Sequence, residues 1–404
     1  MSFLHPLRIT TSLSRDFKAT DVPHRFTLKI FTGGHNSPPD GKAIEKMEEF
    51  RTEQAYVSAR ILKRRFNFIP SFYEYTVEFQ PKATEPPVRN LTPRVVRFGG
   101  DPTAESTEAY LDRGDWQAIE AFLRSQVDSQ LRDWYVNTLA AEVGEYPQWL
   151  DEWVDKRPGE YLPLLFRGYF RVTWAWAART GQRARNVTDE QFRGFHQRLD
   201  LAREDLDAAA RLAPHDEAGA FAFMIPVAMG LQWDKATVMQ IYQEAQRRRP
   251  WHQLVHASMI QALAPKWSGS LQAMMDLARS TTPAPTGSGA LIAVPHAHTE
   301  AAAESDSKDY WREPQVVEEI LTAAQRTIWA AGAYETPLTL NLHRAFLYCF
   351  IQMGEAEHAL REFSAVDGRL GYPFTNMAEP AAAYKNAYVR FSARQATPSG
   401  SDAG

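Results

Sequence analysis

The 404-residue chain contains a single cysteine, Cys349, within the apolar segment RAFLYCFIQM. One cysteine excludes a disulfide within the chain and indicates a reducing compartment. No apolar run approaches the roughly 20 residues that a membrane-spanning helix needs. The opening residues, MSFLHPLRITTSLSRDF, lack the basic and apolar parts of a secretory signal. These absences predict a soluble, cytoplasmic protein that does not contact membranes.

Tryptophan is absent from the first hundred residues, although the chain has 11 tryptophans between Trp116 and Trp329. The same hundred residues carry 16 Lys and Arg against 10 Asp and Glu, a balance of +6, and the remainder has a balance of −10. Opposite charges favour docking of the two parts on each other, or an acidic ligand for the first part. The change in composition predicts a domain of residues 1–100, a domain of residues 101–395, and a disordered tail of residues 396–404.

The first domain is predicted to be a small α+β unit. Apolar and polar side chains alternate in RFTLKIFT and in FYEYTVEFQ, which is typical of half-buried strands. LRITTSL and RVVRF are further strand candidates. Between the two alternating segments, apolar residues recur at helical spacing and predict one amphipathic helix from about Pro39 to Arg64. These apolar residues are Ile44, Met47, Phe50, Val57 and Ile61.

From residue 101 onward the strong signals are helical. Proline follows Asp101, Glu313 and Thr336, where the first turn of a helix tolerates a missing N–H. A further helix is expected over about residues 189–212. Its buried stripe would comprise Phe195, Leu199, Ala202, Leu206 and Ala209. We therefore expect a mainly α fold, in which an array of helical hairpins follows the small α+β domain.

Two helical hairpins repeat with an offset of 36 residues, which aligns Pro214 with Pro250. Apolar residues coincide at this offset, a pattern typical of stacked helix–turn–helix repeats. The aligned pairs are Ala202 with Val238, Leu206 with Tyr242, Ala209 with Ala245, Ala218 with Leu254, and Met224 with Ile260.

The segment LAREDLDAAARLAPHDEAGAFAFMIPVAMGL resembles tetratricopeptide repeats in a degenerate form, with small residues where paired helices pack closely. The segment HQLVHASMIQALAPKWSGSLQAMMDLARSTTPAPTGSGAL resembles uncharacterised bacterial tetratricopeptide-like proteins that carry a Pro-Lys-Trp-x-Gly-Ser turn. The resemblance covers about residues 185–375. It implies a tetratricopeptide-like array and assigns no activity.

Two pairs of residues are candidate binding residues. Lys266 and Trp267, in the turn APKWSGS, could form a recognition loop because one is charged and the other is large. A structural role is the alternative, in which Gly269 allows a tight turn and Trp267 fills a gap between repeats. Trp149 and Trp153 form the second pair, within the acidic segment EYPQWLDEWVDKRP. That segment is also explained as a solvated acidic face with both indoles behind it.

Three other motifs have simpler explanations. His252 and His256 have a spacing that can chelate a metal, but no third ligand is evident and a packed or solvent-facing pair is expected. FTGGHNSPPDG could bind phosphate at a helix N-terminus, or it could merely connect a strand to a helix. LKRRFNF could contact nucleic acid, or its cations could satisfy the end of a helix. We expect no metal, no cofactor and no catalytic residue, and nucleic-acid binding is not favoured.

Helical repeats usually form surfaces that hold other molecules. The leading hypothesis is therefore a non-enzymatic adaptor or regulator that binds a protein or peptide partner in a groove of the array. One alternative is a small-molecule-binding protein or enzyme centred on residues 1–100, motivated by GGHNSPPDG, His24 and His35. The other is an oligomeric structural protein joined through the ends of the repeats.

Overall fold

The computed structural model describes residues 17–19, 25–31, 46–47, 58–67, 72–80, 92–179, 189–305, 307–330 and 336–396. Contacts between residues divide the chain into two units. The first unit comprises Met1–Pro86, Arg124–Val127 and Tyr334–Thr336, and the second comprises the remaining residues. Most of the described residues are helical, which confirms the predicted mainly α fold.

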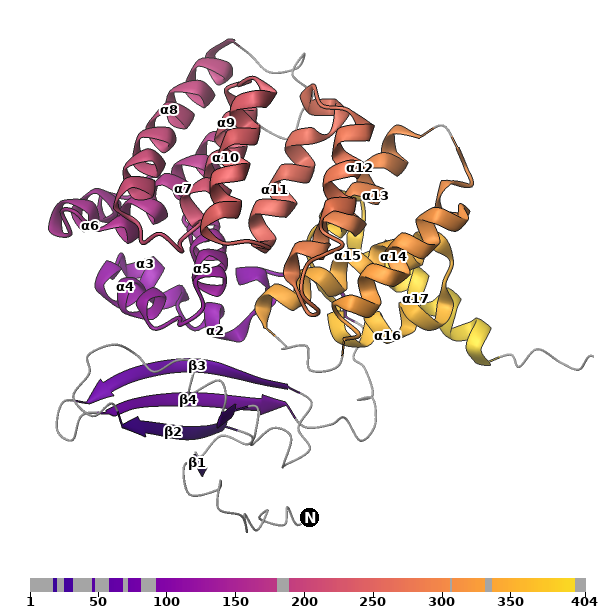
Figure 1. The fold of residues 1–404 in the computed structure, drawn as a ribbon, viewed down its shortest axis with the longest axis horizontal. Helices are drawn as coiled ribbons and strands as arrows, with labels where there is room; N and C mark the ends of the chain where they lie inside the picture. Colours follow the sequence, from indigo (N-terminus) through magenta and orange to yellow (C-terminus); the bar gives the residue numbers. More distant parts are fainter. Residues whose placement is uncertain are drawn as a thin grey trace, which may run out of the picture. The chain divides into compact units, whose positions relative to one another are not determined.

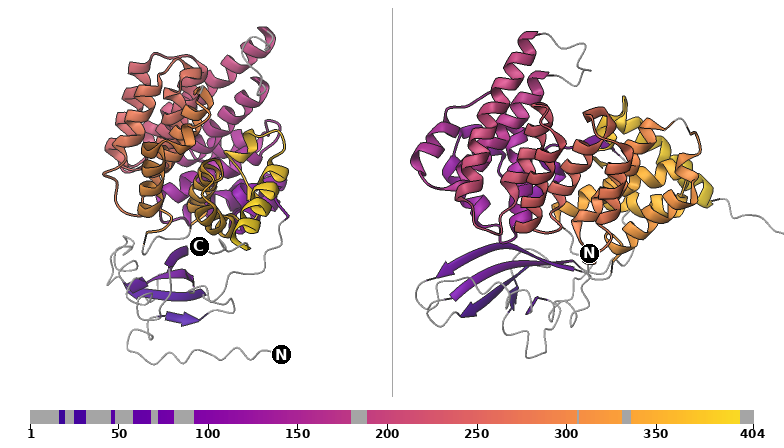
Figure 2. Two further views of the ribbon diagram at one scale, coloured as in Figure 1. Left: turned by 90° about the vertical axis from the view of Figure 1, so that its right-hand side faces the viewer. Right: turned by 45° about the horizontal axis from the view of Figure 1, so that its top comes forward.

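The first unit contains a four-stranded antiparallel sheet with the strand order β1-β2-β4-β3 (Figure 1). Its strands are β1 (Phe17–Ala19), β2 (Arg25–Phe31), β3 (Ser58–Asn67) and β4 (Phe72–Gln80). β2 and β4 are the two strands that the alternating segments predict. Val77 of β4 is fully buried, as expected for the apolar face of this strand. Figure 2 shows the strands as one curved layer.

The predicted helix over residues 39–64 is wrong from Ser58 onward, because β3 begins there. Residues 46–47 are helical. The register of β3 against β4 shifts between Ile61 and Lys63. Ile61 is the one residue of the expected stripe that lies in β3, and it follows Val57 at a spacing of four, which puts two residues on one face in a strand as well as in a helix. The basic residues of LKRRFNF consequently lie within a strand and not at a helix end.

Several other predictions concern residues outside the described part of the chain. They include the strand candidate LRITTSL, the glycine-rich loop GGHNSPPDG, His24, and the tail after Ala396. RVVRF is described, and its residues Arg94–Val95 form the short strand β5.

The second unit consists of helices packed around two hydrophobic cores. The first core lies among the helices from α2 to α13. These helices are α2 (Pro102–Glu105), α3 (Glu108–Arg113), α4 (Trp116–Arg124), α5 (Ser129–Glu142), α6 (Trp149–Lys156), α7 (Tyr161–Arg179), α8 (Asp189–Leu212), α9 (Gly219–Gly230), α10 (Lys235–Arg248), α11 (Gln253–Leu263), α12 (Leu271–Ser280) and α13 (Ala293–Glu304). The proline at the start of α2 confirms the predicted signal, and the Asp101 carboxylate caps this helix by accepting from the backbone N of Ala104 at 2.9 Å.

The helices α8, α9, α10 and α11 lie side by side in this core (Figure 1). α9 packs against α8, α10 and α11. The predicted stripe of α8 is buried throughout, and the five further pairs aligned by the 36-residue offset are fully or partly buried, whereas Pro214 and Pro250 are exposed. α8 and α9 approach closely at Gly230, where a Cβ atom would lie 2.8 Å from Cζ of Phe195.

The second core lies among the C-terminal helices, drawn in orange and yellow in Figure 1. They are α14 (Pro314–Arg326), α15 (Pro337–Met353), α16 (Ala356–Val366) and α17 (Pro380–Ala396). Cys349 of α15 is fully buried. β5 pairs in parallel with β6 (Arg369–Leu370), which ties the first described residues of this unit to its C-terminal helices.

Candidate functional site

A pocket of about 440 Å³ lies between the end of α3, the end of α5 and the start of α6. Its volume falls within the roughly 300–1,000 Å³ that is usual for ligand pockets. The lining combines carboxylates with one indole ring. The lining residues that matter for the argument are Asp112, Gly114, Glu142, Glu145, Trp149 and Glu152.

Trp149 begins α6 and forms one wall of the pocket. The indole is half-buried and packs against Phe166 of α7, with 6.0 Å between the ring centroids. It also packs against Gly114, which ends α3 in the left-handed conformation with a φ of 65°. A Cβ atom at residue 114 would lie 2.6 Å from Cδ1 of Trp149. Glycine therefore permits both the turn and the close approach of the indole.

Glu142, at the end of α5, has a structural role in the lining. Its carboxylate accepts from Nε of Arg97 at 2.8 Å and from the backbone N of Phe98 at 2.9 Å. These bonds fix the end of α5. Arg97 also pairs with Glu108, so the two carboxylates share one guanidinium group.

The other carboxylates of the pocket are exposed to solvent. Asp112, Glu145 and Glu152 have no ion-pair partner among the described residues, and Arg113 is the cation in the lining. The pocket thus carries an excess of negative charge beside the Trp149 ring. Carboxylates and an aromatic face both attract an ammonium or guanidinium group, so this lining favours a cationic ligand.

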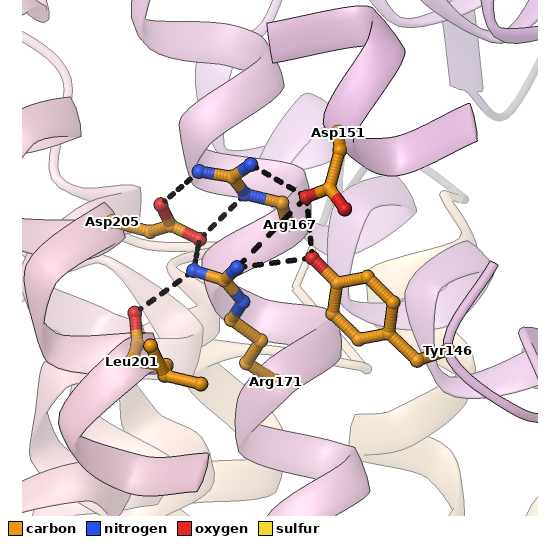
Figure 3. Close-up of polar contacts among 6 residues, drawn as sticks. All are labelled: Tyr146, Asp151, Arg167, Arg171, Leu201 and Asp205. Atoms are coloured by element: carbon orange, nitrogen blue, oxygen red, sulfur yellow. Dashed lines mark hydrogen bonds and ion pairs between the residues drawn. The ribbon is translucent and has the colours of Figure 1, made fainter. Parts of the chain in front are cut away.

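A polar network braces the helices behind the pocket (Figure 3). Arg167 and Arg171 lie one turn apart on α7, and both bind Asp205 of α8, whose side chain is only 4% exposed. Arg167 donates from Nε and Nη2 to the two carboxylate oxygens at 2.9 and 2.7 Å. Arg171 donates from Nη1 to Oδ2 at 2.7 Å. One buried carboxylate therefore holds two guanidinium groups, which gives the network strong charge-assisted bonds.

The same network reaches the pocket wall through Tyr146 and Asp151, which flank Trp149 in the sequence (Figure 3). Arg167 donates from Nη1 to Oδ1 of Asp151 at 2.8 Å. The Tyr146 hydroxyl donates to the same oxygen at 2.6 Å and accepts from Nη2 of Arg171 at 3.0 Å. The segment that carries Trp149 is thereby fastened to α7 on both sides, and the pocket is held in shape without a ligand.

The network does not supply an acid or a base near neutral pH. Burial acts to lower the pKa of Arg167, but the hydrogen bond to Asp205 and its charge outweigh burial, so the pKa is raised. Burial and the hydrogen bond to Asp151 raise the pKa of Tyr146. Both groups stay protonated, and two cations balance two anions. The arrangement therefore serves to position the wall of the pocket.

Trp153 lies one turn after Trp149 but does not reach the pocket. Its side chain is fully buried and stacks on Trp116, with 6.3 Å between ring centroids. It also packs against Phe166 at 5.4 Å, the ring that supports Trp149. Of this candidate pair, Trp149 is the residue that a ligand can touch.

Lys266 and Trp267 lie near the other end of α7. The Trp267 ring packs edge-on against Trp176, with 5.3 Å between centroids, and Nζ of Lys266 pairs with Glu300 of α13 at 2.7 Å. Phe166 and Trp176, the α7 residues that the two candidate indoles contact, are about 15 Å apart along the helix axis. The structure therefore does not bring the two candidate pairs together.

The structure of the turn APKWSGS gives Gly269 a different role from the tight turn that the structural alternative predicts. The Ser270 hydroxyl caps α12 by accepting from the backbone N of Ala273 at 3.1 Å. A side chain at Gly269 would overlap the backbone carbonyl of Leu263. The left-handed residue of the turn is Ser268, with a φ of 61°. Glycine is thus needed here for close packing.

His252 and His256 are fully buried and form part of the packing. Nε2 of His252 lies 3.0 Å from Oδ2 of Asp133, and Nδ1 of His256 lies 2.9 Å from the carbonyl oxygen of His252. In the part of the chain that the structure describes, no group of three or more His, Cys, Asp or Glu residues is arranged to hold a metal.

Sequence patterns identified the acidic segment and Trp149, but not Gly114, Asp112 or Asp205. These residues reach the site from distant segments, and no local period encodes such contacts. The sequence contains one signal that could have indicated the role of Asp205. Arg167 and Arg171 lie on a strongly apolar helix at a spacing that puts both on one face, and buried arginines require a carboxylate from elsewhere.

Comparisons of the chain with protein-family models, with curated proteins and with solved structures gave no match. The resemblance to tetratricopeptide-like proteins therefore stays a prediction from the sequence. None of the helices in the described segments is long and apolar enough to cross a membrane.

Proposed function

We propose that the helical unit binds a protein or peptide partner, and that the pocket beside Trp149 receives a basic side chain of that partner. The observation that supports this most is the combination of a half-buried indole with three exposed carboxylates in one pocket of about 440 Å³. A cation over an indole face gains about 0.5–1 kcal/mol at an exposed site. The carboxylates add charge complementarity, which selects a basic group.

A peptide suits this pocket better than a free cation does. Asp112, Glu145 and Glu152 are exposed, and ion pairs at such positions contribute only about 0–1 kcal/mol each. A free amine therefore binds weakly. A peptide can add contacts along the neighbouring helices, and these contacts raise its affinity above that of the isolated basic group.

The repeat pattern supports the same function. The hairpins α8–α9 and α10–α11, offset by 36 residues, favour a tetratricopeptide-like arrangement, and stacked helical hairpins offer extended surfaces to a partner. In this proposal the protein is a non-enzymatic adaptor or regulator, and Lys266 and Trp267 stabilise the array.

Capture of partners tests the proposal. The tagged full-length protein would be incubated with lysate of its native cell. The pocket variant D112N/E145Q/E152Q would be incubated with the same lysate in a parallel experiment. A control variant, E204Q/D207N/E304Q, removes three exposed charges from α8 and α13. We expect mass spectrometry to identify a partner that the unaltered protein and the control retain and the pocket variant loses. A partner retained equally by all three proteins would contradict the role of the pocket.

The two alternative functions predict different results when the full-length protein and the pocket variant are compared. A nucleotide, sugar or metal that raises the melting temperature of the full-length protein and of the pocket variant alike would favour a small-molecule site elsewhere in the chain. A molar mass above that of the monomer in light scattering would favour an oligomeric structural protein.

A further inference from the structure

The sheet of the first unit places most of its basic residues on one face. Residues that align across neighbouring strands share a face, and the two faces alternate along each strand. Val77 is fully buried and marks the apolar face, whereas Glu74, Thr76 and Glu78 occupy the opposite face, here called the basic face. Six of the seven Lys and Arg residues in these strands align with them, and the seventh, Arg64, lies on the apolar face. The six are Lys18 of β1, Arg25 and Lys29 of β2, and Arg60, Lys63 and Arg65 of β3.

A shift in register brings the basic residues of β3 to the same face. Arg60 precedes the shift between Ile61 and Lys63, and Arg65 follows it. In a regular strand Lys63 and Arg65 would lie on the face opposite to Arg60, because odd and even positions alternate. One extra residue in β3 reverses this alternation. Three cations of a single strand therefore share the basic face.

The basic face has more positive charge than the carboxylates of the strands can balance. Glu74 and Glu78 are the acidic residues of the four described strands, and each is aligned between a cation of β2 and a cation of β3. Pairing across the strands can neutralise two of the six cations. The remaining excess extends over about 13 Å along β2, from Arg25 to Lys29.

Two aromatic residues continue the basic face at one end. Phe31 of β2 aligns with Phe72 of β4, and this pair lies two positions beyond the pair of Lys29 and Glu74. Cations bind the phosphates of nucleic acid, and aromatic residues offer rings on which unpaired bases stack. An acidic peptide would use the cations but would leave the aromatic pair without a role.

We propose that the basic face binds single-stranded nucleic acid. The cations of β2 and β3 bind the phosphates, and unpaired bases stack on Phe31 and Phe72. The competing explanation for the cations of LKRRFNF, that they satisfy the end of a helix, does not apply because they lie within β3. This site belongs to the first unit and is separate from the pocket beside Trp149.

Fluorescence anisotropy with a labelled RNA of about 15 nucleotides and mixed sequence tests the proposal in the full-length protein. We expect K63Q/R65Q to bind about tenfold more weakly and to reduce the slope of log K against log salt concentration by about 1.4, since each phosphate contact to a single strand contributes about 0.7. K308Q/K385Q removes two exposed lysines of the second unit and should bind like the unaltered protein. Arg64→Gln, on the apolar face, should also retain the affinity. No binding by the unaltered protein, or equal binding by K63Q/R65Q, would overturn the proposal.

The variant Phe72→Leu distinguishes nucleic acid from an acidic partner. Loss of one stacking ring should weaken RNA binding roughly tenfold and leave the salt slope unchanged. Polyglutamate with the same number of charges would be added as a competitor. Release of the RNA by polyglutamate, together with full affinity in Phe72→Leu, would replace nucleic acid by an acidic protein as the occupant of the basic face.

Ultraviolet crosslinking of the unaltered, full-length protein requires no variant to fold. Mass spectrometry should find the RNA attached to peptides from β2, β3 or β4. RNA attached only to helices of the second unit would contradict the assignment to the sheet. None of these measurements involves the pocket beside Trp149, so their failure leaves the proposed partner binding untouched.

Discussion

At the scale of single residues, the shape of the pocket depends on the contact between Gly114 and Trp149. Substituting Gly114→Ala places a Cβ atom 2.6 Å from the indole at a residue with a φ of 65°. We expect the free energy of unfolding to fall by about 1–3 kcal/mol, the usual cost of such backbone strain. The control is Gly144→Ala in the same lining, where a Cβ atom meets nothing within 4 Å. Equal losses for both variants in urea denaturation would refute this account of the wall.

Asp205 is the second residue with a measurable role, because its buried carboxylate binds both Arg167 and Arg171. Replacing it with asparagine leaves the partly exposed Asp151 as the remaining anion beside the two guanidinium groups, and we expect the free energy of unfolding to fall by about 3–5 kcal/mol. Asp200→Asn on the same helix is the matched control, since Asp200 lies 3.8 Å from Arg203 in an exposed pair. That change should cost less than about 0.5 kcal/mol in chemical denaturation. The account of Figure 3 is wrong if Asp205→Asn is equally mild.

Residue types alone predicted part of the site. The sequence EYPQWLDEWVDKRP indicated an acidic surface with indoles behind it, and the buried Trp153 and half-buried Trp149 agree with that interpretation. It gave no sign that Asp151 is engaged in ion pairs while Glu145 and Glu152 are not. That distinction depends on arginines supplied by other segments, which a local pattern cannot reveal.

At the scale of secondary structure elements, glycines determine how closely neighbouring helices approach. A methyl group at Gly230 of α9 would collide with the Phe195 and Leu199 side chains of α8. We expect Gly230→Ala to lower the free energy of unfolding by about 1–3 kcal/mol through overpacking. Gly194→Ala is the control on α8, because a Cβ atom there meets nothing within 4 Å. Alanine favours helix more than glycine does, so this control should be neutral or stabilise the fold by up to about 1 kcal/mol.

The predictability of each element followed the strength of its local signal. The range of α8 and its buried stripe were predicted from apolar period and from the following Pro214, and β4 from strict alternation. β3 was missed because Ile61 continues the spacing of the preceding apolar residues, and a spacing of four fits one face of a helix or of a strand. The pairing of β3 with β4 decides between the two, and a local pattern does not reveal that pairing.

At the scale of the whole molecule, the mainly α fold could be predicted and the pocket could not. Helix signals are local, whereas the pocket is assembled from the ends of α3 and α5 and the start of α6. The excess of negative charge after residue 100 was visible in the sequence. The carboxylates that line the pocket contribute part of this charge. The proposed binding depends on exposed carboxylates, so it should weaken as ionic strength rises and the Debye length falls from about 10 Å at 0.1 M to about 3 Å at 1 M salt. Titration of a captured partner at several salt concentrations measures this, and affinity that is independent of salt would contradict a charge-selected interface.

The central claim is that the pocket beside Trp149 selects a basic side chain, and selection from random peptides tests it most directly. The full-length protein, the pocket variant D112N/E145Q/E152Q and the control E204Q/D207N/E304Q would each be presented with the same peptide library. We expect the unaltered protein and the control to enrich Lys or Arg at one position of the selected peptides, and the pocket variant to lose that enrichment. Selection without a preference for Lys or Arg, or the same preference in the pocket variant, would contradict the claim.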